Sequence, residues 1–206
     1  TVEQKFDMMT QEPVNRLILS LALPTIISML ITSIYNMADA YFVSKISTSA
    51  SGAVGIAYSL MAVIQAIGFT FGAGSGNYIS RLLGQKKNKY ASQVAATGFF
   101  SALILGAILA LLGLLFLEPL TFALGATDTI APYAKDYIRY ILIGAPYMTA
   151  SFVLNVVLRF QGSAFYAMLG IGTGGLLNIV LDPILIFRLG MGTGGAALAA
   201  LTEQSK

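Results

Sequence analysis

Charged residues divide this chain into long apolar segments. The stretches without Asp, Glu, Lys or Arg are 17–38, 46–80, 90–117, 140–158, 160–181 and 189–202. A bilayer core about 30 Å thick is crossed by roughly 20 helical residues. Five of the stretches are long enough to cross it, and the last is too short. The pattern predicts five complete membrane helices and a partial sixth.

We expect the helices at 16–44, 54–80, 91–117, 137–159, 165–188 and from 192 onward. The segments 44–52, 84–89 and 118–132 are small and polar, basic, or rich in turn signals, which predicts loops. Runs such as 109–117 do not alternate polar and apolar residues as the strands of a membrane β-barrel do. The fold class predicted is therefore an all-α membrane protein, with residues 1–206 forming one transmembrane bundle.

Composition narrows the possible functions. Only 10% of the 206 residues are charged and 56% are hydrophobic, whereas soluble domains carry about 25% charged residues. These values exclude a disordered chain and a soluble enzyme. The chain has neither Cys nor His, so disulfides, thiolate nucleophiles, Cys/His zinc sites and imidazole-based catalysis are excluded as well. We expect no enzymatic activity, no resident cofactor and no nucleic-acid partner.

Basic residues near the helix ends predict the orientation. With a cytoplasmic N-terminus, eight Lys and Arg residues lie inside and four lie outside, in keeping with the positive-inside rule. The inner set is Lys5, Arg16, Arg81, Lys86, Lys87, Lys89, Arg159 and Lys206, and the outer set is Lys45, Lys135, Arg139 and Arg188. We therefore predict a multi-pass plasma-membrane protein with its N-terminus in the cytoplasm.

The last apolar segment is short. Residues 192–206 make about 22 Å of helix, which does not cross a bilayer. We expect that the polypeptide is cut within its sixth helix. The alternative is a helix that stops part-way and is covered by another element.

Two carboxylates lie in apolar segments, where an unpaired charge costs about 2.5–3.5 kcal/mol. Asp39 is near the end of the first helix, with Tyr35 and Asn36 one turn before it. Asp182 is near the end of the fifth helix and follows Asn178 by four residues. The first and fifth helices run in the same direction, so both carboxylates are expected in the outer half of the bundle. Their polar faces are predicted to meet around a water-filled pocket.

The proline after Asp182 strengthens this interpretation. The residue before a proline is pushed away from α geometry, and broken membrane helices tend to line cavities. A carboxyl group in such a site can bind and release a proton, or hold a small cation together with the Asn178 amide oxygen. For Asp39, which lies close to Ser44, a solvated position at the membrane interface is the alternative.

Other polar side chains are candidates for lining the same cavity. Tyr35, Asn36, Tyr137 and Asn155 offer aromatic faces and hydrogen bonds to an organic cation. For Tyr137, which we expect at the start of the fourth helix, an aromatic belt at the membrane interface explains the residue equally well.

The sequence resembles a known family at several points in order. The segments PTIISML (24–30) and YNMADAYFV (35–43) resemble the first helix of MATE multidrug exporters. The segments that follow the same pattern are GAVGIA (52–57), GAGSG (72–76), SRLLG (80–84), QG (161–162) and LNIVLDP (177–183). The resemblance covers nearly the whole chain and is closest to the bacterial DinF-like branch. It implies the N-terminal lobe of a twelve-helix protein built from two six-helix lobes.

The resemblance implies antiport, in which an organic, often cationic compound leaves the cell while protons or sodium ions enter. The family's coupling-cation site maps onto Asp39, Asn178 and Asp182, and Tyr35, Tyr137 and Asn155 match further polar positions. The implied partners are the lipid bilayer, small organic substrates, and a second lobe or a second copy of the chain. Family members commonly have Thr where this sixth helix has Ala200, and the missing hydroxyl weighs against sodium.

Two alternatives stay open. The chain is a truncated or split lobe that transports nothing alone, or it belongs to a lipid-linked oligosaccharide flippase of the same superfamily. A flippase is expected to place more cationic residues in its cavity, whereas here Arg139 and Arg159 lie at helix ends.

Overall fold

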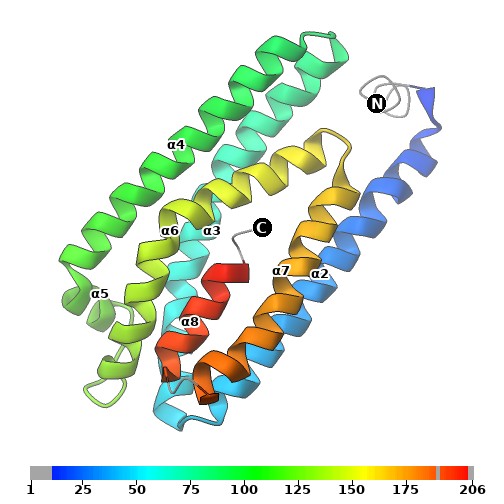
Figure 1. The fold of residues 1–206 in the computed structure, drawn as a ribbon. Coiled ribbons are helices and arrows are strands. Elements are labelled where there is room, and N and C mark those ends of the chain that lie inside the picture. The colour runs from blue at the N-terminus through cyan, green and yellow to red at the C-terminus, as the bar shows by residue number, and fades with distance from the viewer. Residues whose placement is uncertain (1–10, 189–190, 204–206) are drawn as a thin grey trace.

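The computed structural model describes residues 11–188 and 191–203, apart from the side chains of residues 187, 202 and 203. Every regular element in these ranges is a helix (Figure 1). They are α2 (Val14–Ser44), α3 (Thr48–Gly84), α4 (Asn88–Leu115), α5 (Leu117–Ala123), α6 (Ala131–Phe160), α7 (Ala164–Pro183), the π-helix η1 (Ile184–Arg188) and α8 (Gly192–Glu203).

Five of these helices are long and apolar enough to cross a membrane, as predicted. They are α2, α3, α4, α6 and the continuous helix formed by α7 and η1. The sixth apolar helix, Gly192–Leu201, is shorter. The predicted helix from 165 to 188 changes to π geometry directly after Pro183, whose ring removes one backbone donor and disturbs the α pattern.

Three loop predictions were too long. The segment 44–52 is helical from Thr48, because the Ser47 side chain accepts a hydrogen bond from the Ala50 amide at 3.0 Å and caps α3. The segment 118–132 contains most of α5 and the start of α6. Pro132 lies in the first turn of α6, where proline is tolerated. In the segment 84–89 the turn covers only residues 85–87.

Helix α6 is the centre of the packing and touches α3, α4, α5, α7 and α8. Gly68, Gly72 and Gly76 on α3 face α6 so closely that a Cβ at Gly72 would lie 2.8 Å from Val156 Cβ. On the other side of α6, the Thr149 hydroxyl donates to the Ala102 carbonyl of α4 at 2.9 Å. Small residues and one buried hydrogen bond thus hold three long helices together.

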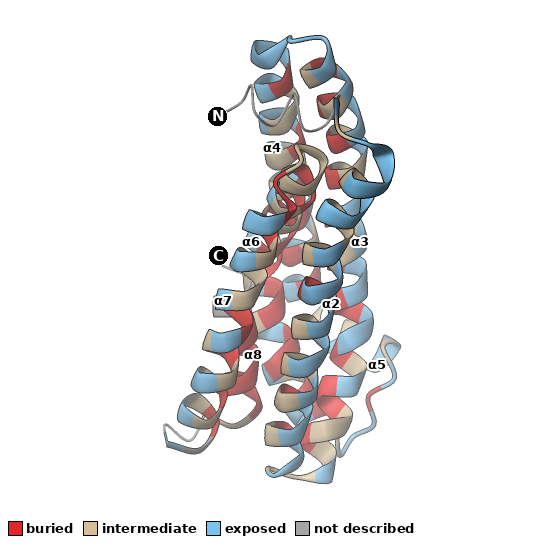
Figure 2. Ribbon diagram, turned by 90° about the vertical axis from the view of Figure 1, so that its right-hand side faces the viewer, coloured by how far each residue is buried: buried red, intermediate tan, exposed pale blue. Residues whose placement is uncertain are grey.

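The helices α2 and α7 form a second group. They pack mainly on each other, and α8 lies between α7 and α6 (Figure 1). Figure 2 shows buried residues on the inner faces and exposed residues on the outer faces of the long helices. The exposed outer faces carry large apolar side chains such as Leu23, Met29, Phe100 and Leu111, as expected for a multi-pass protein surrounded by lipid.

The alternation of helix direction also sorts the described cations. Those on the ends of α2, α3, α4 and α6 near the turn at 85–87 are Arg16, Arg81, Lys86, Lys87, Lys89 and Arg159. Those at the opposite end are Lys45, Lys135, Arg139 and Arg188. Lys5 and Lys206 lie outside the described residues, so the balance is six against four. Which end faces the cytoplasm stays a prediction.

Candidate cation and substrate cavity

A polar cavity of about 230 Å³ lies between the two groups of helices. Its wall combines a carboxylate, three carboxamides, three phenol rings and several small or apolar side chains. The lining residues are Tyr35, Asn36, Asp39, Tyr58, Met61, Ala62, Gln65, Tyr137, Asn178 and Ala200. They come from α2, α3, α6, α7 and α8, so every described α-helix except α4 and α5 contributes.

Helix α2 supplies the residues that the sequence placed on one face. Tyr35, Asn36 and Asp39 are spaced three and four residues apart, which brings them to one side of the helix. Asp39 is buried, with an exposed fraction of 6%. The alternative of a solvated Asp39 at the interface is therefore wrong, because the side chain faces into the bundle.

Asn178 of α7 lines the same cavity as Asp39. Its side chain is 1% exposed, and neither its Oδ1 atom nor Oδ1 of Asp39 has a hydrogen-bond partner among the described residues. Buried polar oxygens are normally satisfied, and leaving one unsatisfied costs about 1–3 kcal/mol. Two such oxygens, on residues that line one cavity, are groups that a proton or a small hard cation would satisfy.

Asp182 follows Asn178 by one turn and is fully buried, with an exposed fraction of 0%. It is not among the residues that line the cavity. It stands in the last turn of α7, before Pro183 and the change to π geometry. Of the predicted pair on α7, Asn178 lines the cavity. Asp182 is buried one turn closer to the C-terminal end of the helix.

Tyr137 also lines the cavity, with an exposed fraction of 1%. The belt interpretation is wrong for this residue, because α6 begins at Ala131 and Tyr137 lies two turns inside it, on the side facing α8 and α2.

Asn155 is not brought to the cavity. Its Nδ2 donates to the Ala167 carbonyl of α7 at 3.3 Å, and its Oδ1 accepts from Arg159 Nε at 3.1 Å. The first bond joins α6 to α7 and the second lies within α6, at the end of the bundle opposite Asp39. Asn155 is therefore not among the residues that line this cavity, and a contact with substrate stays a prediction.

Sequence reasoning missed the contribution of α3. Tyr58, Met61, Ala62 and Gln65 follow the spacing i, i+3, i+4 and i+7, which is one face of a helix. Gln65 is a carboxamide in the middle of the charge-free stretch 46–80. A polar residue at that position on the same face as Tyr58 was the signal that a cavity wall runs along this helix.

Comparison with known proteins identifies the family. The family model described as MatE matches residues 24–184. The multidrug export protein MepA of Staphylococcus haemolyticus is 35% identical over 178 residues, which are 86% of this chain and 39% of that protein. An FAD transporter of Shewanella oneidensis is 32% identical over 193 residues, which are 92% of this chain and 43% of that protein.

Solved structures agree with the fold. A multidrug resistance MATE family transporter of the MOP superfamily, in its outward-facing conformation, superposes with a TM-score of 0.90 at 33% identity. A MOP superfamily transporter from Pyrococcus furiosus, described as having a binding pocket of reverse polarity, superposes with the same TM-score and identity. Each superposition covers 97% of this chain and 44% of the other. The chain spans less than half the length of these relatives, and on this evidence it belongs to the MATE family of membrane transporters.

Proposed function

We propose that this chain is the N-terminal lobe of a plasma-membrane exporter that moves organic, often cationic compounds out of the cell in exchange for protons or sodium ions. The proposal includes no catalytic step and no resident cofactor, because the coupling ion is cargo. The observation that carries it is the cavity that joins the Asp39 carboxylate, the Asn178 amide and three tyrosines.

Coupling follows from competition for one carboxylate. Asp39 and Asn178 line the cavity and each has a buried oxygen without a partner in the described part of the chain, with Asp182 one turn further along α7. An entering cation that binds Asp39 neutralises the charge that holds an organic cation and so favours its release. The membrane potential supplies about 2.3 kcal/mol per charge per 100 mV, which is enough to drive accumulation on the outer side.

The lining favours a cationic substrate. Tyr35, Tyr58 and Tyr137 line the same cavity as the Asp39 carboxylate, and aromatic faces attract organic cations. No Lys or Arg is among the described residues that line the cavity. The phosphate groups of an anionic cargo would therefore find no positively charged partner among these lining residues. The relative named as an FAD transporter keeps such a cargo as the second candidate, and the flippase alternative is disfavoured on the same ground.

The length of the chain bears on its partner. Alternating access in transporters built from repeats uses two halves that move against each other. The chain covers 44% of its structural relatives. The proposal therefore includes a second lobe, or a second copy of this chain, that closes the open side of the cavity. The alternative is a lobe that binds substrate but transports nothing alone.

Transport is tested by ethidium export from proteoliposomes that hold this chain, under an imposed proton or sodium gradient. Asp39→Asn and Asp182→Asn are expected to abolish gradient-driven export. Asp136→Asn, on an exposed carboxylate of α6 outside the cavity, is the matched control and should leave it unchanged. Export that is equal in all variants would overturn the assignment of the carboxylates.

A binding assay separates the two halves of the proposal. Ethidium fluorescence on the purified chain is expected to report binding that Asp39→Asn weakens at least about tenfold, the equivalent of about 1.4 kcal/mol. Binding without export means a lobe that needs its partner. A folded chain with neither binding nor export would overturn the proposal that this cavity takes organic cations.

A further inference from the structure

A second cavity opens on the other side of the molecule and has no role in the proposed transport. It is a recess of about 270 Å³ at the end of α4, next to α5. Leu109 and Leu112 of α4 line it together with Phe116, which connects α4 to α5, and Leu120 of α5 and Leu142 of α6 complete the lining. Its lining is apolar throughout, so water would find no polar partner there.

The recess faces the surroundings of the bundle rather than its interior. The side chains of Leu112 and Phe116 are 51% and 61% exposed, and the neighbouring Leu111 and Leu115 are exposed as well. This is the outward face of a helix that is apolar enough to span a membrane. The surrounding medium is therefore hydrocarbon, and an acyl chain matches the apolar lining of the recess.

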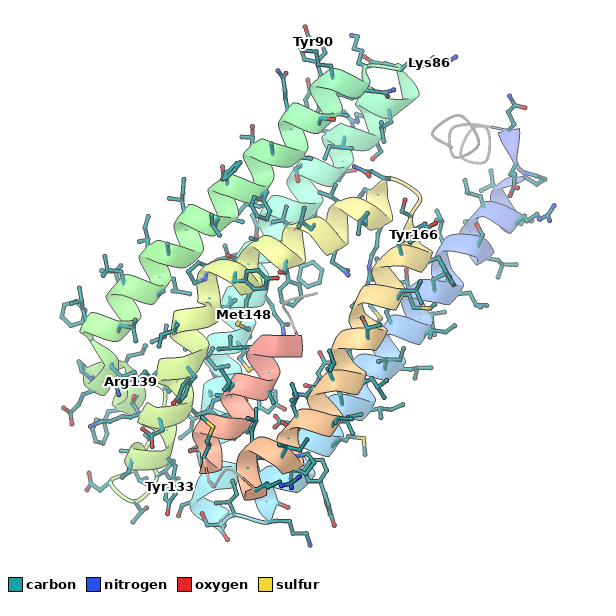
Figure 3. All side chains as sticks on the ribbon, viewed as in Figure 1. Lys86, Tyr90, Tyr133, Arg139, Met148 and Tyr166 are labelled. Carbon is teal, nitrogen blue, oxygen red and sulfur yellow. The ribbon has the colours of Figure 1, made fainter. Side chains whose placement is uncertain are left out.

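A cation stands one turn from the recess. Lys135, Arg139 and Leu142 follow the spacing i, i+4 and i+7 along α6, so they lie on one side of the helix. Lys135 Nζ lies 2.6 Å from Glu118 Oε1 at the start of α5, and Leu142 lines the recess. Arg139 lies between these two contacts, on the part of α6 beside α5 (Figure 3).

Arg139 differs from Lys135 in its partners. Within the described part of the chain, no carboxylate oxygen lies within 4.0 Å of its guanidinium, and this includes Asp136, which is one turn before it. An arginine within a membrane-spanning helix is costly and is normally paired. Long arginine side chains near the end of a spanning helix extend toward the interface, where lipid phosphates lie, and the planar fork of arginine suits bidentate binding of a phosphate.

We propose that this recess is a binding site for one membrane phospholipid, with an acyl chain along α4 and the phosphate on Arg139. The apolar lining of the recess selects the acyl chain, and the Arg139 guanidinium selects the phosphate of the headgroup. Glu118 does not repel the phosphate, because Lys135 neutralises it. The site is independent of the transport proposal, since it shares no residue with the polar cavity.

The absence of Trp from the sequence allows a direct test. Leu112→Trp places a single fluorophore in the wall of the recess, at a position exposed enough to accept the larger ring. The chain is reconstituted in phosphatidylcholine vesicles, and quenching is measured with small fractions of brominated phosphatidylcholine or brominated diacylglycerol, which has no phosphate. We expect the phosphatidylcholine to quench with about fivefold higher relative affinity, the size of one cation–headgroup contact.

Variants in the same reporter background isolate Arg139. Arg139→Gln is expected to remove the preference for phosphatidylcholine while leaving quenching by diacylglycerol unchanged, which also shows that the recess is intact. Arg139→Lys should keep part of the preference. Arg188→Gln, at the same end of the bundle but on η1, is the matched control and should keep all of it. Equal quenching by both lipids, or an effect of Arg188→Gln as large as that of Arg139→Gln, would overturn the site. No quenching by either lipid would overturn it too, because the face would then be covered by protein.

Discussion

At the scale of single residues, Ala200 decides how many oxygens the polar cavity offers to an ion. Ala200 lines the cavity on α8, at the position where the family resemblance implies Thr. A threonine hydroxyl there would add an oxygen ligand near Asp39 and Asn178, and sodium binds through several such oxygens. We expect Ala200→Thr to lower the sodium concentration that displaces ethidium by about tenfold, equivalent to about 1.4 kcal/mol.

The control for Ala200→Thr is Ala62→Thr, which puts the same hydroxyl on the α3 wall of the cavity. It should change the sodium dependence much less. A sodium response that stays flat in both variants would place the ion away from α8.

Asn155 and Asn178 were both predicted as site residues, but they have different surroundings in the structure. Asn155 joins α6 to α7 through one hydrogen bond and bonds to Arg159 within α6, whereas Asn178 lines the cavity and has a buried oxygen without a partner among the residues described. Asn155→Ala is expected to lower the free energy of unfolding by about 1–3 kcal/mol and to leave the ethidium dissociation constant unchanged. Asn178→Ala is expected to raise the ethidium dissociation constant and to leave the free energy of unfolding unchanged. Thermal unfolding and a binding titration on the same samples would check both expectations.

At the scale of helices, the glycines of α3 set the distance to α6. A Cβ at Gly72 would lie 2.8 Å from Val156 Cβ, whereas a Cβ at Gly74 would have nothing within 4 Å. Gly72→Ala is therefore expected to cost about 1–3 kcal/mol through overpacking. Gly74→Ala, two residues away on the exposed side, should be neutral or slightly stabilising. Thermal unfolding of the two variants in detergent compares them, and equal melting temperatures would contradict the close α3–α6 contact.

Helices were the part of the fold that the sequence predicted best. Charge-free stretches of membrane length identify spanning segments because the bilayer excludes unpaired charge, whatever the tertiary contacts. Helix starts were harder, since Ser47 and Pro132 look like loop residues but belong to the first turns of helices or cap them. The site was predicted where carboxylates stood out in apolar surroundings, as with Asp39. Gln65 and Tyr58 were missed because an uncharged polar residue reveals its direction only when the neighbouring helix is known.

At the scale of the whole molecule, two groups of helices meet around the polar cavity. One consists of α3, α4, α5 and α6, held by close glycine contacts, and the other of α2 and α7, with α8 between them (Figure 1). Asp39 and Asn178 lie in the half of the bundle nearer Lys45 and Arg188. The direction from which a coupling ion reaches Asp39 therefore depends on which end of the bundle faces the outside.

The absence of Cys makes that orientation measurable with single cysteines. Asn88→Cys marks the basic end without altering its charge, and Thr129→Cys marks the opposite end between α5 and α6. Because six described cations gather at the first end and four at the second, we expect a membrane-impermeant maleimide to label Thr129→Cys in intact cells. Asn88→Cys should react only after the membrane is opened. The reverse pattern would place Asp39 on the cytoplasmic side, so the inward ion gradient would reach the cavity only after passing the length of the bundle.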